Sequence, residues 1–498
     1  MTEHAVVIAG AGPAGLMLAG ELALGGADVA VIERRPDQRL AGSRALGITA
    51  RTIEVFDQRG IADRFLSAGQ TAQVTGFATT RLDISDFPTR HGYGLALRQK
   101  HIERILAAWV AELGVPILYG REVTGFVQDD AGVVVELAGG HSMRARFLAG
   151  CDGGRGLVRK MAGIEFPGSD PTTSSILAEV EMTERPPYGV HRSPAGTYAF
   201  GREEFEIRNG QIIYREIGPI GVMVTEPDAK ATGEPTLDDL RRLLVAACGT
   251  DFGVHSPTWI SRFTDMTRQA AAYRAGRVLL AGDAAHVHSP VGGLGLSTGV
   301  QDAVNLGWKL AQVVSGASPD SLLDTYHAER HPVGAGVLKA TMAQVALLRE
   351  DERTVAARDI VLDLLRMDEP RRRIAGMMSG LDIRYDFGAG HPLLGRRMPD
   401  LDVVTAGGLR RVFSFLHHAR PVVLDFTSSL AGGARWPERM QYVEARYEGR
   451  WELPVIGDVA APAAVLIRPD GHVAWVGDGT SQGLEDALRR WFGMPLVP

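Results

Sequence analysis

Three short segments of the 498-residue chain combine glycines with charged residues that can bind phosphates and hydroxyl groups. They read, in chain order, Gly10-Ala-Gly-Pro-Ala-Gly15, Cys151-Asp-Gly-Gly-Arg155 and Gly282-Asp-Ala-Ala-His286. Glycines allow a backbone to approach a phosphate closely, and aspartates accept hydrogen bonds from hydroxyl groups. This combination predicts a site for a dinucleotide.

The first segment lies between an apolar run, residues 5–9, and a helical pattern that begins at Leu16. A strand, a glycine turn and a helix in this order bind a dinucleotide pyrophosphate. The first glycine allows the tight turn, the second the approach of the phosphate, and the third the packing of helix on strand. The helix N-terminus offers free N–H groups. We therefore expect the pyrophosphate to contact Gly10, Gly12, Ala14 and Gly15.

A second apolar run, residues 27–32, ends at Glu33. This position is close to the ~20 residues beyond the last glycine at which an acid binds a ribose hydroxyl. Because a carboxylate there repels a 2′-phosphate, the bound dinucleotide is expected to be FAD or NAD rather than NADP. Arg34, the next residue, joins the candidate cofactor-binding set.

The third segment favours FAD. Residues 274–281 have the pattern of a turn followed by a buried strand, which delivers Asp283 to the strand end, where it can accept hydrogen bonds from ribityl hydroxyls. A glycine-rich loop, residues 290–295, then leads into a helical pattern over residues 297–310. Backbone donors at that helix start suit the flavin C2 carbonyl and N1, although an ordinary loop before a helix fits the pattern as well. The candidate contacts here are Asp283, Gly293, Gly295 and Leu296.

Over nearly its whole length the chain resembles the class A flavoprotein monooxygenases, the para-hydroxybenzoate hydroxylase family. Within that family it is most similar to the aromatic polyketide hydroxylases of actinobacterial antibiotic pathways. The matching stretches are the glycine turn, residues 42–60, Arg98–Gln99, residues 152–159 and residues 282–310. The resemblance implies an α/β fold in which a Rossmann-like FAD-binding domain carries a β-sheet substrate domain and a C-terminal thioredoxin-like domain.

By the same resemblance, the FAD-binding domain with a helical extension is expected over residues 1–75, 100–170 and 271–390. The substrate-binding sheet domain is expected over residues 76–99 and 171–270, and the thioredoxin-like domain over residues 391–498. That last domain contains no cysteine, so dithiol chemistry is excluded there and a packing or oligomer-contact role is expected. The two cysteines of the chain are expected to be free thiols, namely Cys151 and Cys248.

The resemblance also implies roles for single residues. Arg44 would lie near the pyrophosphate and the flavin edge, and Gln99 would contact the ribityl or flavin region. Asp152, Gly153 and Arg159 would belong to an element shared by FAD and NAD(P)H. For the two arginines, a solvated surface position is the alternative.

Two positions depart from the family pattern. Gly156 stands where the family usually has Ser, which leaves the second segment without that hydroxyl. After Gly293 the family usually reads Gln-Gly-Met/Leu-Asn, whereas this chain reads Leu294-Gly-Leu-Ser297. The resemblance still implies that the Pro290 carbonyl lies close to the flavin ring. Since backbone N–H groups depend little on side-chain identity, the sequence predicts a modified site rather than an inactive one.

Residues 75–100 and 170–270 are rich in strand-like and irregular patterns. In the family that the chain resembles, this region forms a sheet that covers the substrate above the flavin, where aromatic rings could stack on a polycyclic substrate. Each such side chain taken alone is a core residue more often than a pocket residue. No substrate contact is therefore assigned to Tyr93, Phe200, Phe205, Tyr214, Met223 or Trp259.

The resemblance implies an FAD-dependent monooxygenase that consumes NADPH or NADH and O₂. It would hydroxylate an aromatic polyketide-type substrate through a flavin C4a-hydroperoxide in antibiotic biosynthesis. No catalytic base is assigned, because structural hydrogen bonding explains His286 and His288 at least as well. The alternatives are a Baeyer–Villiger oxygenase, an antibiotic-inactivating oxygenase and a non-catalytic flavin-binding partner protein. No metal site is expected.

Composition agrees with an ordinary globular protein, because 45% of the residues are hydrophobic and 22% are charged. The 53 basic and 59 acidic residues, with a net charge of −6, give no reason to expect a nucleic-acid or membrane partner. The lack of a charged-then-apolar leader and of a long apolar run predicts a cytoplasmic protein. A homodimer is left open.

Overall fold

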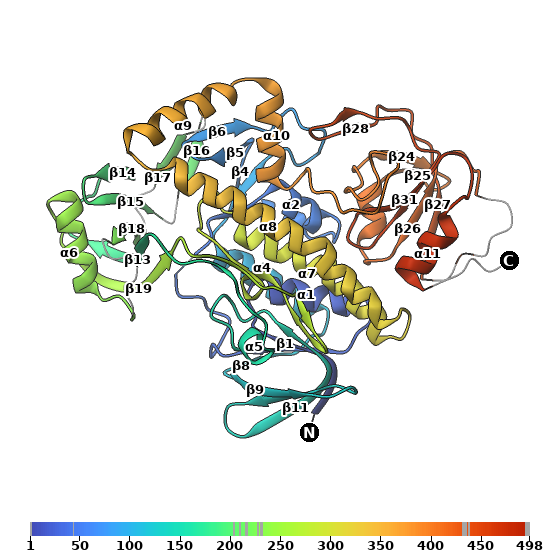
Figure 1. Ribbon diagram of the computed structural model, residues 1–498, viewed down its shortest axis with the longest axis horizontal. Coiled ribbons are helices and arrows are strands. Elements are labelled where there is room, and N and C mark those ends of the chain that lie inside the picture. Colours follow the sequence, from blue (N-terminus) through green and yellow to red (C-terminus); the bar gives the residue numbers. More distant parts are fainter. Residues whose placement is uncertain are drawn as a thin grey trace.

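The computed structural model describes residues 2–42, 44–202, 205–208, 211–214, 218–226, 229, 233–430, 436 and 439–493. Figure 1 shows a central α/β unit, a β-sheet unit with α6 (Leu237–Cys248) on its outer side, and a C-terminal unit built around a small sheet. The two outer units lie at opposite ends of the central unit (Figure 1).

The central sheet contains β1 (Thr2–Ala9), β2 (Val29–Glu33), β8 (Ile117–Tyr119), β11 (His141–Gly150), β21 (Arg274–Ala275) and β22 (Val278–Leu280), with β9 (Val123–Gln128) and β10 (Val133–Leu137) alongside β11. The strand order is β21-β22-β11-β1-β2-β8. The pairs β22/β11, β11/β1, β1/β2 and β2/β8 are parallel. All five residues of β2 are buried, which is typical of a parallel strand covered on both faces.

The helices of the central unit are α1 (Pro13–Leu24), α2 (Ala50–Asp57), α3 (Ala62–Leu66), α4 (Gln99–Glu112), α5 (Leu157–Met161), α7 (Gly295–Val314), α8 (Asp324–Leu347), α9 (Glu352–Leu364) and α10 (Asp368–Ser379), with the 3₁₀ turns η1 (Gly282–Ala284) and η2 (Asp320–Leu323). α1 packs against both α4 and α7. A Cβ at Gly20 would lie 2.1 Å from the Trp109 ring, and one at Gly307 would lie 2.3 Å from the Glu21 side chain. These glycines therefore set the close spacing of the three helices.

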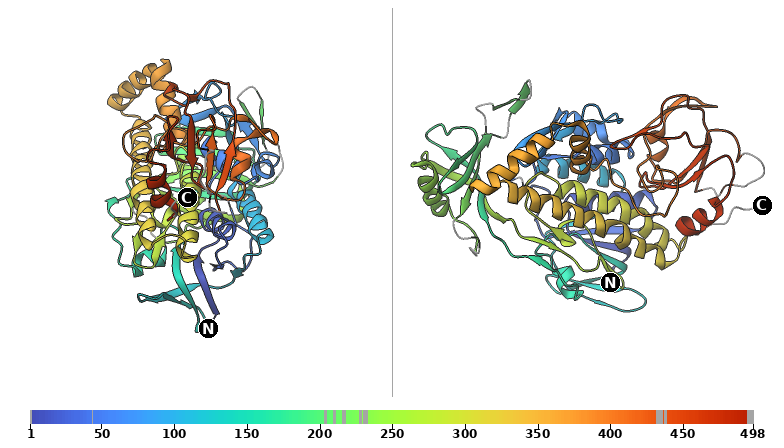
Figure 2. Two further views of the ribbon diagram at one scale, coloured as in Figure 1. Left: turned by 90° about the vertical axis from the view of Figure 1, so that its right-hand side faces the viewer. Right: turned by 45° about the horizontal axis from the view of Figure 1, so that its top comes forward.

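A layer of short strands lies beside α9 and α10 (Figure 2). It contains β3 (Gly47–Ile48), β4 (Gln70–Ala72), β5 (Val74–Phe77), β6 (Thr80–Asp83) and β7 (Gly94–Ala96). β7 pairs with both β3 and β4, β5 pairs with β6, and α10 packs against β5 and β6. The layer thus lies between the start of α2, which β3 directly precedes, and α10, which packs against β5 and β6.

The β-sheet unit, here called the roof, contains β13 (Ser174–Met182), β14 (Gly189–Ser193), β15 (Gly196–Arg202), β18 (Ile220–Glu226) and β19 (Val254–Thr264) in the order β14-β15-β18-β13-β19. Alternate residues of β13 pack against α6, so the residues between them face the central unit. The Trp259 ring of β19 lies against the central unit, because a Cβ at Gly42 would be 2.2 Å from it. The hairpin β16 (Phe205–Arg208) and β17 (Gln211–Tyr214) and the small sheet β12 (Gly168–Ser169), β20 (Thr267–Gln269) and β23 (His286–Val287) accompany the roof.

The C-terminal unit contains β24 (Asp402–Thr405), β25 (Gly408–Arg411), η3 (Val412–Leu416), β26 (Val422–Asp425), β27 (Gln441–Glu444), β28 (Glu452–Leu453), β29 (Gly457–Asp458), β30 (Ala464–Ile467), β31 (Val473–Gly477) and α11 (Leu484–Phe492). Its main sheet has the order β27-β26-β30-β31, with β27 parallel to β26 and the other pairs antiparallel. α11 packs against β31. This mixed four-stranded sheet with its helix is the thioredoxin-like unit expected from the sequence.

Most elements read from the sequence are confirmed. The strand predicted over residues 5–9 is present within β1, and the one predicted over residues 27–32 is present as β2. The helix predicted over residues 297–310 is present within the longer α7, and the last helix runs through Trp491 as expected. The helical pattern over residues 340–380 spans the end of α8 together with α9 and α10. The exact domain boundaries stay a prediction. Both cysteines are free. Within the described ranges, no helix has the length and apolar character that a membrane span requires.

Candidate cofactor site and active site

The three glycine-bearing segments lie side by side at one edge of the central sheet. β1, β11 and β22 run parallel and end just before them. The N–H of Cys151 donates to Ala9 O at 2.9 Å, and that of Ala281 donates to Gly150 O at 3.0 Å. The carboxyl edge of a doubly wound sheet is where such folds bind nucleotides. Topology therefore brings together residues that are far apart in the sequence.

The first segment is shaped for a pyrophosphate. Gly10 has a φ of +105°, and a Cβ there would lie 2.4 Å from Cys151 O. A Cβ at Gly15 would lie 2.0 Å from Gly10 O, so the helix approaches the strand only because that position is glycine. A Cβ at Gly12 meets no described atom within 4 Å, and no described side chain caps the start of α1. This open space and the uncapped first turn, which includes Ala14, fit a phosphate group.

Glu33 lies at the carboxyl end of β2, beside this turn. Its Oε2 accepts from the N–H of Ala11 at 2.8 Å, and its Oε1 accepts from the N–H of Arg35 at 2.9 Å. Burial raises the pKa of Glu33, but the hydrogen bonds from Arg35 and Ala11 outweigh burial and lower the pKa below its usual value. The carboxylate is therefore ionised at neutral pH, the form that accepts hydrogen bonds from ribose hydroxyls.

Arg35 joins this cluster, whereas the Arg34 named from the sequence is exposed. Arg35 donates to Glu103 Oε2 at 2.8 Å, and Gln99 Nε2 donates to the other Glu103 oxygen at 2.8 Å. Gln99 is thus connected to Glu33 through two intermediate side chains. The two-residue period of an extended segment places Arg35 on the side of Glu33, which is the signal that the sequence analysis missed. No comparable signal marked Glu103.

Asp152 follows β11 and turns its carboxylate toward the start of α5. Its Oδ2 accepts from the N–H of Val158 at 2.9 Å, while its Oδ1 is buried without a hydrogen-bond partner among the described residues. Burial raises the pKa of Asp152. A Cβ at Gly156 would lie 2.1 Å from Oδ1, so this position of the carboxylate requires glycine. The departure from the family pattern at Gly156 therefore creates the space that Asp152 occupies.

Arg159 is buried and connects the second segment to the third. Its guanidinium donates to Ala284 O at 3.1 Å and to Gly154 O at 3.2 Å, and it lies 3.7 Å from the centre of the Phe166 ring. A solvated surface position is therefore wrong for Arg159. Arg44, in contrast, is exposed.

Asp283 lies in η1 with its side chain exposed at the sheet edge. Asp302 of α7 stabilises this turn. Its Oδ2 accepts from the N–H of Gly282 at 3.2 Å and lies 2.7 Å from His286 Nε2. Arg330 of α8 donates to Asp302 Oδ1 at 2.7 Å. Burial raises the pKa of Asp302, but Arg330 and His286 outweigh burial and lower it. His286 thus supports the turn, and Asp302 and Arg330 are site residues that the sequence analysis missed.

Two further polar side chains of this region are bonded within the protein. His288 Nδ1 lies 2.7 Å from Ser289 O, and burial lowers the pKa of His288. The Tyr93 hydroxyl lies 2.7 Å from His91 Nδ1, and His91 Nε2 lies 2.8 Å from Asp57 Oδ2. His288 and the Tyr93 hydroxyl therefore form structural hydrogen bonds, and we assign neither of them as a catalytic base.

The loop before α7 presents backbone donors. The N–H of Gly293, which has a φ of +66°, donates to Pro290 O at 3.0 Å. Ser297 Oγ, at the position of the family's usual Asn, accepts from the N–H of Thr49 at 3.1 Å. Ser297 therefore ties α7 to the segment before α2. Because no described side chain caps α7, N–H groups of its first turn remain available to a ligand, including those of Gly295 and Leu296.

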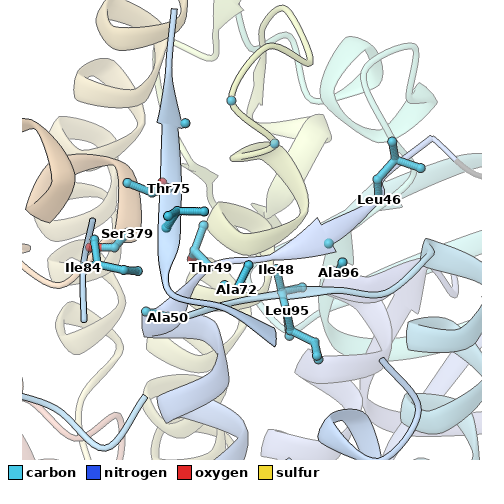
Figure 3. Close-up of a pocket in the computed structure, with 16 residues that line it drawn as sticks. Leu46, Ile48, Thr49, Ala50, Ala72, Thr75, Ile84, Leu95, Ala96 and Ser379 are labelled. Atoms are coloured by element: carbon cyan, nitrogen blue, oxygen red, sulfur yellow. The ribbon is translucent and has the colours of Figure 1, made fainter. Parts of the chain in front are cut away.

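A cavity of about 260 Å³ opens beside this loop. Its walls come from the short-strand layer, the turn at Gly293 and the end of α10 (Figure 3). Leu46, which is 65% exposed, stands at one end of the cavity, and Ile84 and Ser379 stand at the other (Figure 3). A mostly apolar wall with a few hydroxyl groups is typical of a small-molecule site.

The roof supplies some of the aromatic residues named from the sequence. Trp259 faces the central unit, as the Gly42 contact shows, and Phe200 instead lies in the core against α6. The Tyr214 ring lies near Gly201, where a Cβ would be 3.2 Å from it. The side chain of Phe205 lies outside what the structure describes. The parallel sheet, the glycine segments at its carboxyl edge and the cavity beside the loop before α7 are together typical of nucleotide-binding flavoproteins.

Comparison with known proteins agrees with this class. Residues 3–341 match the FAD binding domain family, and residues 391–495 match the family of C-terminal domains of aromatic-ring hydroxylases. The chain is 42% identical to 12-dehydrotetracycline 5-monooxygenase/anhydrotetracycline 6-monooxygenase of Streptomyces rimosus, over 99% of this chain and 100% of that protein. It is 43% identical to rifampicin monooxygenase of Streptomyces venezuelae, over 98% of both chains. A solved aromatic hydroxylase from angucycline biosynthesis superposes with a TM-score of 0.88 at 42% identity, over 100% of both chains.

The chain therefore belongs to the FAD-binding family of flavin-dependent aromatic hydroxylases. Its cofactor is FAD, and it is an FAD-dependent monooxygenase. The resemblance and the α/β fold class predicted from the sequence are confirmed.

Proposed function

We propose that the protein hydroxylates an aromatic polyketide in antibiotic biosynthesis and uses NADPH or NADH to reduce its FAD. The observation that carries this proposal is the convergence of the three segments at one sheet edge, with a mostly apolar cavity beside the loop that precedes α7. Whole-length relatives named for anhydrotetracycline oxygenation and for angucycline biosynthesis support a polycyclic phenol as the substrate.

In this proposal each part of the site has one task. The α1 N-terminus at Gly12 binds the pyrophosphate, Glu33 the ribose and Asp283 the ribityl chain. The N–H groups at the start of α7 favour negative charge on the flavin ring. When bound, FAD supplies the electron transfer from NAD(P)H and the activation of O₂. Further cofactor contacts proposed from the sequence are Arg34, Arg44, Gln99, Asp152, Pro290 and Gly293.

The similarity to rifampicin monooxygenase favours a second candidate, the oxygenation of an antibiotic that the cell inactivates. The site chemistry would be the same, because both activities add one oxygen atom from O₂ to an electron-rich ring. The two candidates differ in which polycyclic compound accelerates cofactor reduction and what becomes of the product.

Stopped-flow kinetics of the purified yellow protein separates these candidates. We expect anhydrotetracycline to accelerate NADPH oxidation and to gain one oxygen atom by mass spectrometry. Acceleration by rifampicin alone would favour the second candidate, and tight FAD without acceleration by any phenol would contradict both. Asp283→Asn should weaken FAD binding, whereas Asp363→Asn, an exposed control on α9, should not.

The proposal also includes a homodimer. α9 leaves Ile360 and Leu364, one turn apart, 64% and 49% exposed, and Met367 beyond the helix is 58% exposed. Clustered apolar exposure of this kind marks contact surfaces. Light scattering should give a dimer for the wild type and a monomer for Ile360→Asp, and a wild-type monomer would contradict this part of the proposal.

A further inference from the structure

A largely buried ion pair connects the roof to the central unit. Arg98, which precedes α4, donates from Nη1 to Glu179 Oε1 at 2.9 Å, and the two side chains are 13% and 11% exposed. Glu179 lies on β13 opposite Trp259 of β19. Paired residues of neighbouring strands point to the same face, so Glu179 faces the central unit together with Trp259.

Arg98 lies next to the segment that lines the cavity. The N–H of Leu97 donates to Leu46 O at 3.1 Å, and the N–H of Gln99 donates to Ala45 O at 2.9 Å. Leu46 lines the cavity, and Gln99 belongs to the candidate cofactor contacts. Arg98 therefore stands where the flavin-binding part of the chain meets the roof.

Arg98 has a donor left over. Its Nε is buried and has no hydrogen-bond partner among the described residues. The part of the roof next to the guanidinium has no side chain at Gly221, where a Cβ would lie 4.0 Å from Nη2. Gly221 pairs with Gly201 of the neighbouring strand, and the Tyr214 ring lies against Gly201. An arginine offers donors only, and a buried N–H without an acceptor costs free energy. An acceptor supplied by a ligand, such as an oxygen atom, would satisfy this side chain.

We propose that Arg98, oriented by Glu179, binds an oxygen atom of the aromatic substrate, a phenol or a ring carbonyl. This inference rests on the proposed function. Trp259, which pairs with Glu179, and Tyr214, whose ring lies against Gly201, place aromatic side chains on the same side of the roof as this ion pair, and a flat substrate can pack against aromatic rings. A guanidinium favours the ionised phenol, whose ring carbons are more electron-rich, so the same contact prepares the ring for oxygenation. Glu179 is a positioning residue.

Ligand binding to the oxidised holoenzyme tests this role without turnover. 2-Naphthol and naphthalene differ by one hydroxyl group, and changes in flavin absorbance report the dissociation constant of each. We expect the wild type to bind 2-naphthol ~10-fold more tightly than naphthalene, and Arg98→Gln to bind both about equally. Arg98→Lys should keep part of the preference, because it keeps the charge but not the planar donors. Glu179→Gln should reduce the preference for 2-naphthol over naphthalene less than Arg98→Gln does.

Arg64→Gln is the matched control, because Arg64 forms an exposed pair with Glu112 at the other end of α4. It should leave both dissociation constants unchanged. No preference for 2-naphthol in the wild type, or equal weakening of both probes in Arg98→Gln and Arg98→Lys, overturns the inference. Thermal melting and FAD content establish that each variant is folded. A failure of the proposed function looks different: 2-naphthol is preferred through Arg98, but anhydrotetracycline does not accelerate NADPH oxidation.

Discussion

The C-terminal unit and the roof are joined to the central unit in different ways. The C-terminal unit has one hydrophobic cluster of its own, but other core residues of it belong to the same cluster as the central sheet, whereas the roof has a separate core against α6. The contacts that join the roof to the rest of the described chain include the largely buried pair Arg98–Glu179, the exposed pair Arg192–Glu350 and the packing of Trp259 on Gly42. The C-terminal unit is tied by a cluster of fully buried charges. Two units that share a hydrophobic core are expected to be joined rigidly, whereas a unit with a separate core can move slightly relative to its neighbour.

The buried charges of the C-terminal interface surround Arg468. Its guanidinium donates to the two oxygens of Glu329 at 2.8 and 2.7 Å and to Asp470 at 3.1 Å, and Lys309 lies 3.1 Å from Glu329. Burial raises the pKa of Glu329, but Arg468 and Lys309 outweigh burial and lower it to about 2. The cluster therefore joins α7 and α8 to the C-terminal sheet with every charge paired.

This interface extends to the η1 turn, which carries Asp283. Arg330, which holds Asp302, also donates to the Tyr385 hydroxyl at 3.2 Å, and the Tyr385 ring stacks on His472 at 4.2 Å. Asp302 in turn accepts from the N–H of Gly282. A chain of contacts through Tyr385, Arg330 and Asp302 thus connects the C-terminal unit to the turn that carries Asp283.

The largest expected effect is on the C-terminal interface. Arg468→Met leaves the Glu329 and Asp470 carboxylates buried without their main partner, which should lower the free energy of unfolding by about 3–5 kcal/mol. Denaturant unfolding followed by tryptophan fluorescence measures this loss. Arg64→Gln, which breaks an exposed pair, should cost less than about 1 kcal/mol. If both variants lost the same free energy of unfolding, the buried charges at the C-terminal interface would not hold that unit more firmly than an exposed ion pair does.

The effect of Asp302 on FAD affinity tests whether the contacts of α7 and α8 with the C-terminal unit matter for cofactor binding. Asp302→Asn weakens the acceptor of the Gly282 N–H and leaves Arg330 without its carboxylate, so FAD should bind ~10-fold more weakly or worse. Titration of the apoprotein with FAD, followed by flavin fluorescence, measures the affinity. An unchanged affinity would show that the turn does not depend on α7 and α8. Asp363→Asn on α9 serves as the control.

The arrangement of the glycine segments could be predicted from the sequence where the signal is local. The glycines at 10, 12 and 15 act within one strand–turn–helix unit, so their spacing alone indicates how they are used. The same holds for Asp283, which is placed by the strand directly before it. The parallel sheet then brings these segments together by topology, which the alternation of strands and helices already implied.

Contacts between distant segments could not be predicted. Nothing near Arg98 in the chain indicates Glu179, and nothing near Glu329 indicates Arg468, because such pairs depend on how separate units dock. The same reason explains Ser297, which bonds to the backbone of a segment far earlier in the chain. An isolated charged residue is normally read as solvated, so buried charges are the residues that sequence analysis misses first.

A pH dependence sharpens the description of the C-terminal interface. Burial lowers the pKa of Lys309 to about 7, despite the opposing effect of Glu329. Because an unfolded lysine titrates near ~10.4, the unfolded state binds more protons between these values. The free energy of unfolding should therefore rise with pH above 7, by up to about 1.4 kcal/mol per pH unit from this group. Lys309→Met should remove that rise, and the exposed control Lys160→Met should not.

The smallest expected effect on stability is at the roof. A double-mutant cycle of Arg98→Gln and Glu179→Gln should give a coupling energy of about 1 kcal/mol, because the pair is a single charged hydrogen bond whose partners keep some contact with solvent. The cycle of Arg468→Met and Glu329→Gln should give a clearly larger value, since two hydrogen bonds connect side chains that are almost completely buried. Equal coupling energies would mean that the roof is held as firmly as the C-terminal unit. Substrate fit would then have to come from the shape of the cavity and not from movement of the roof.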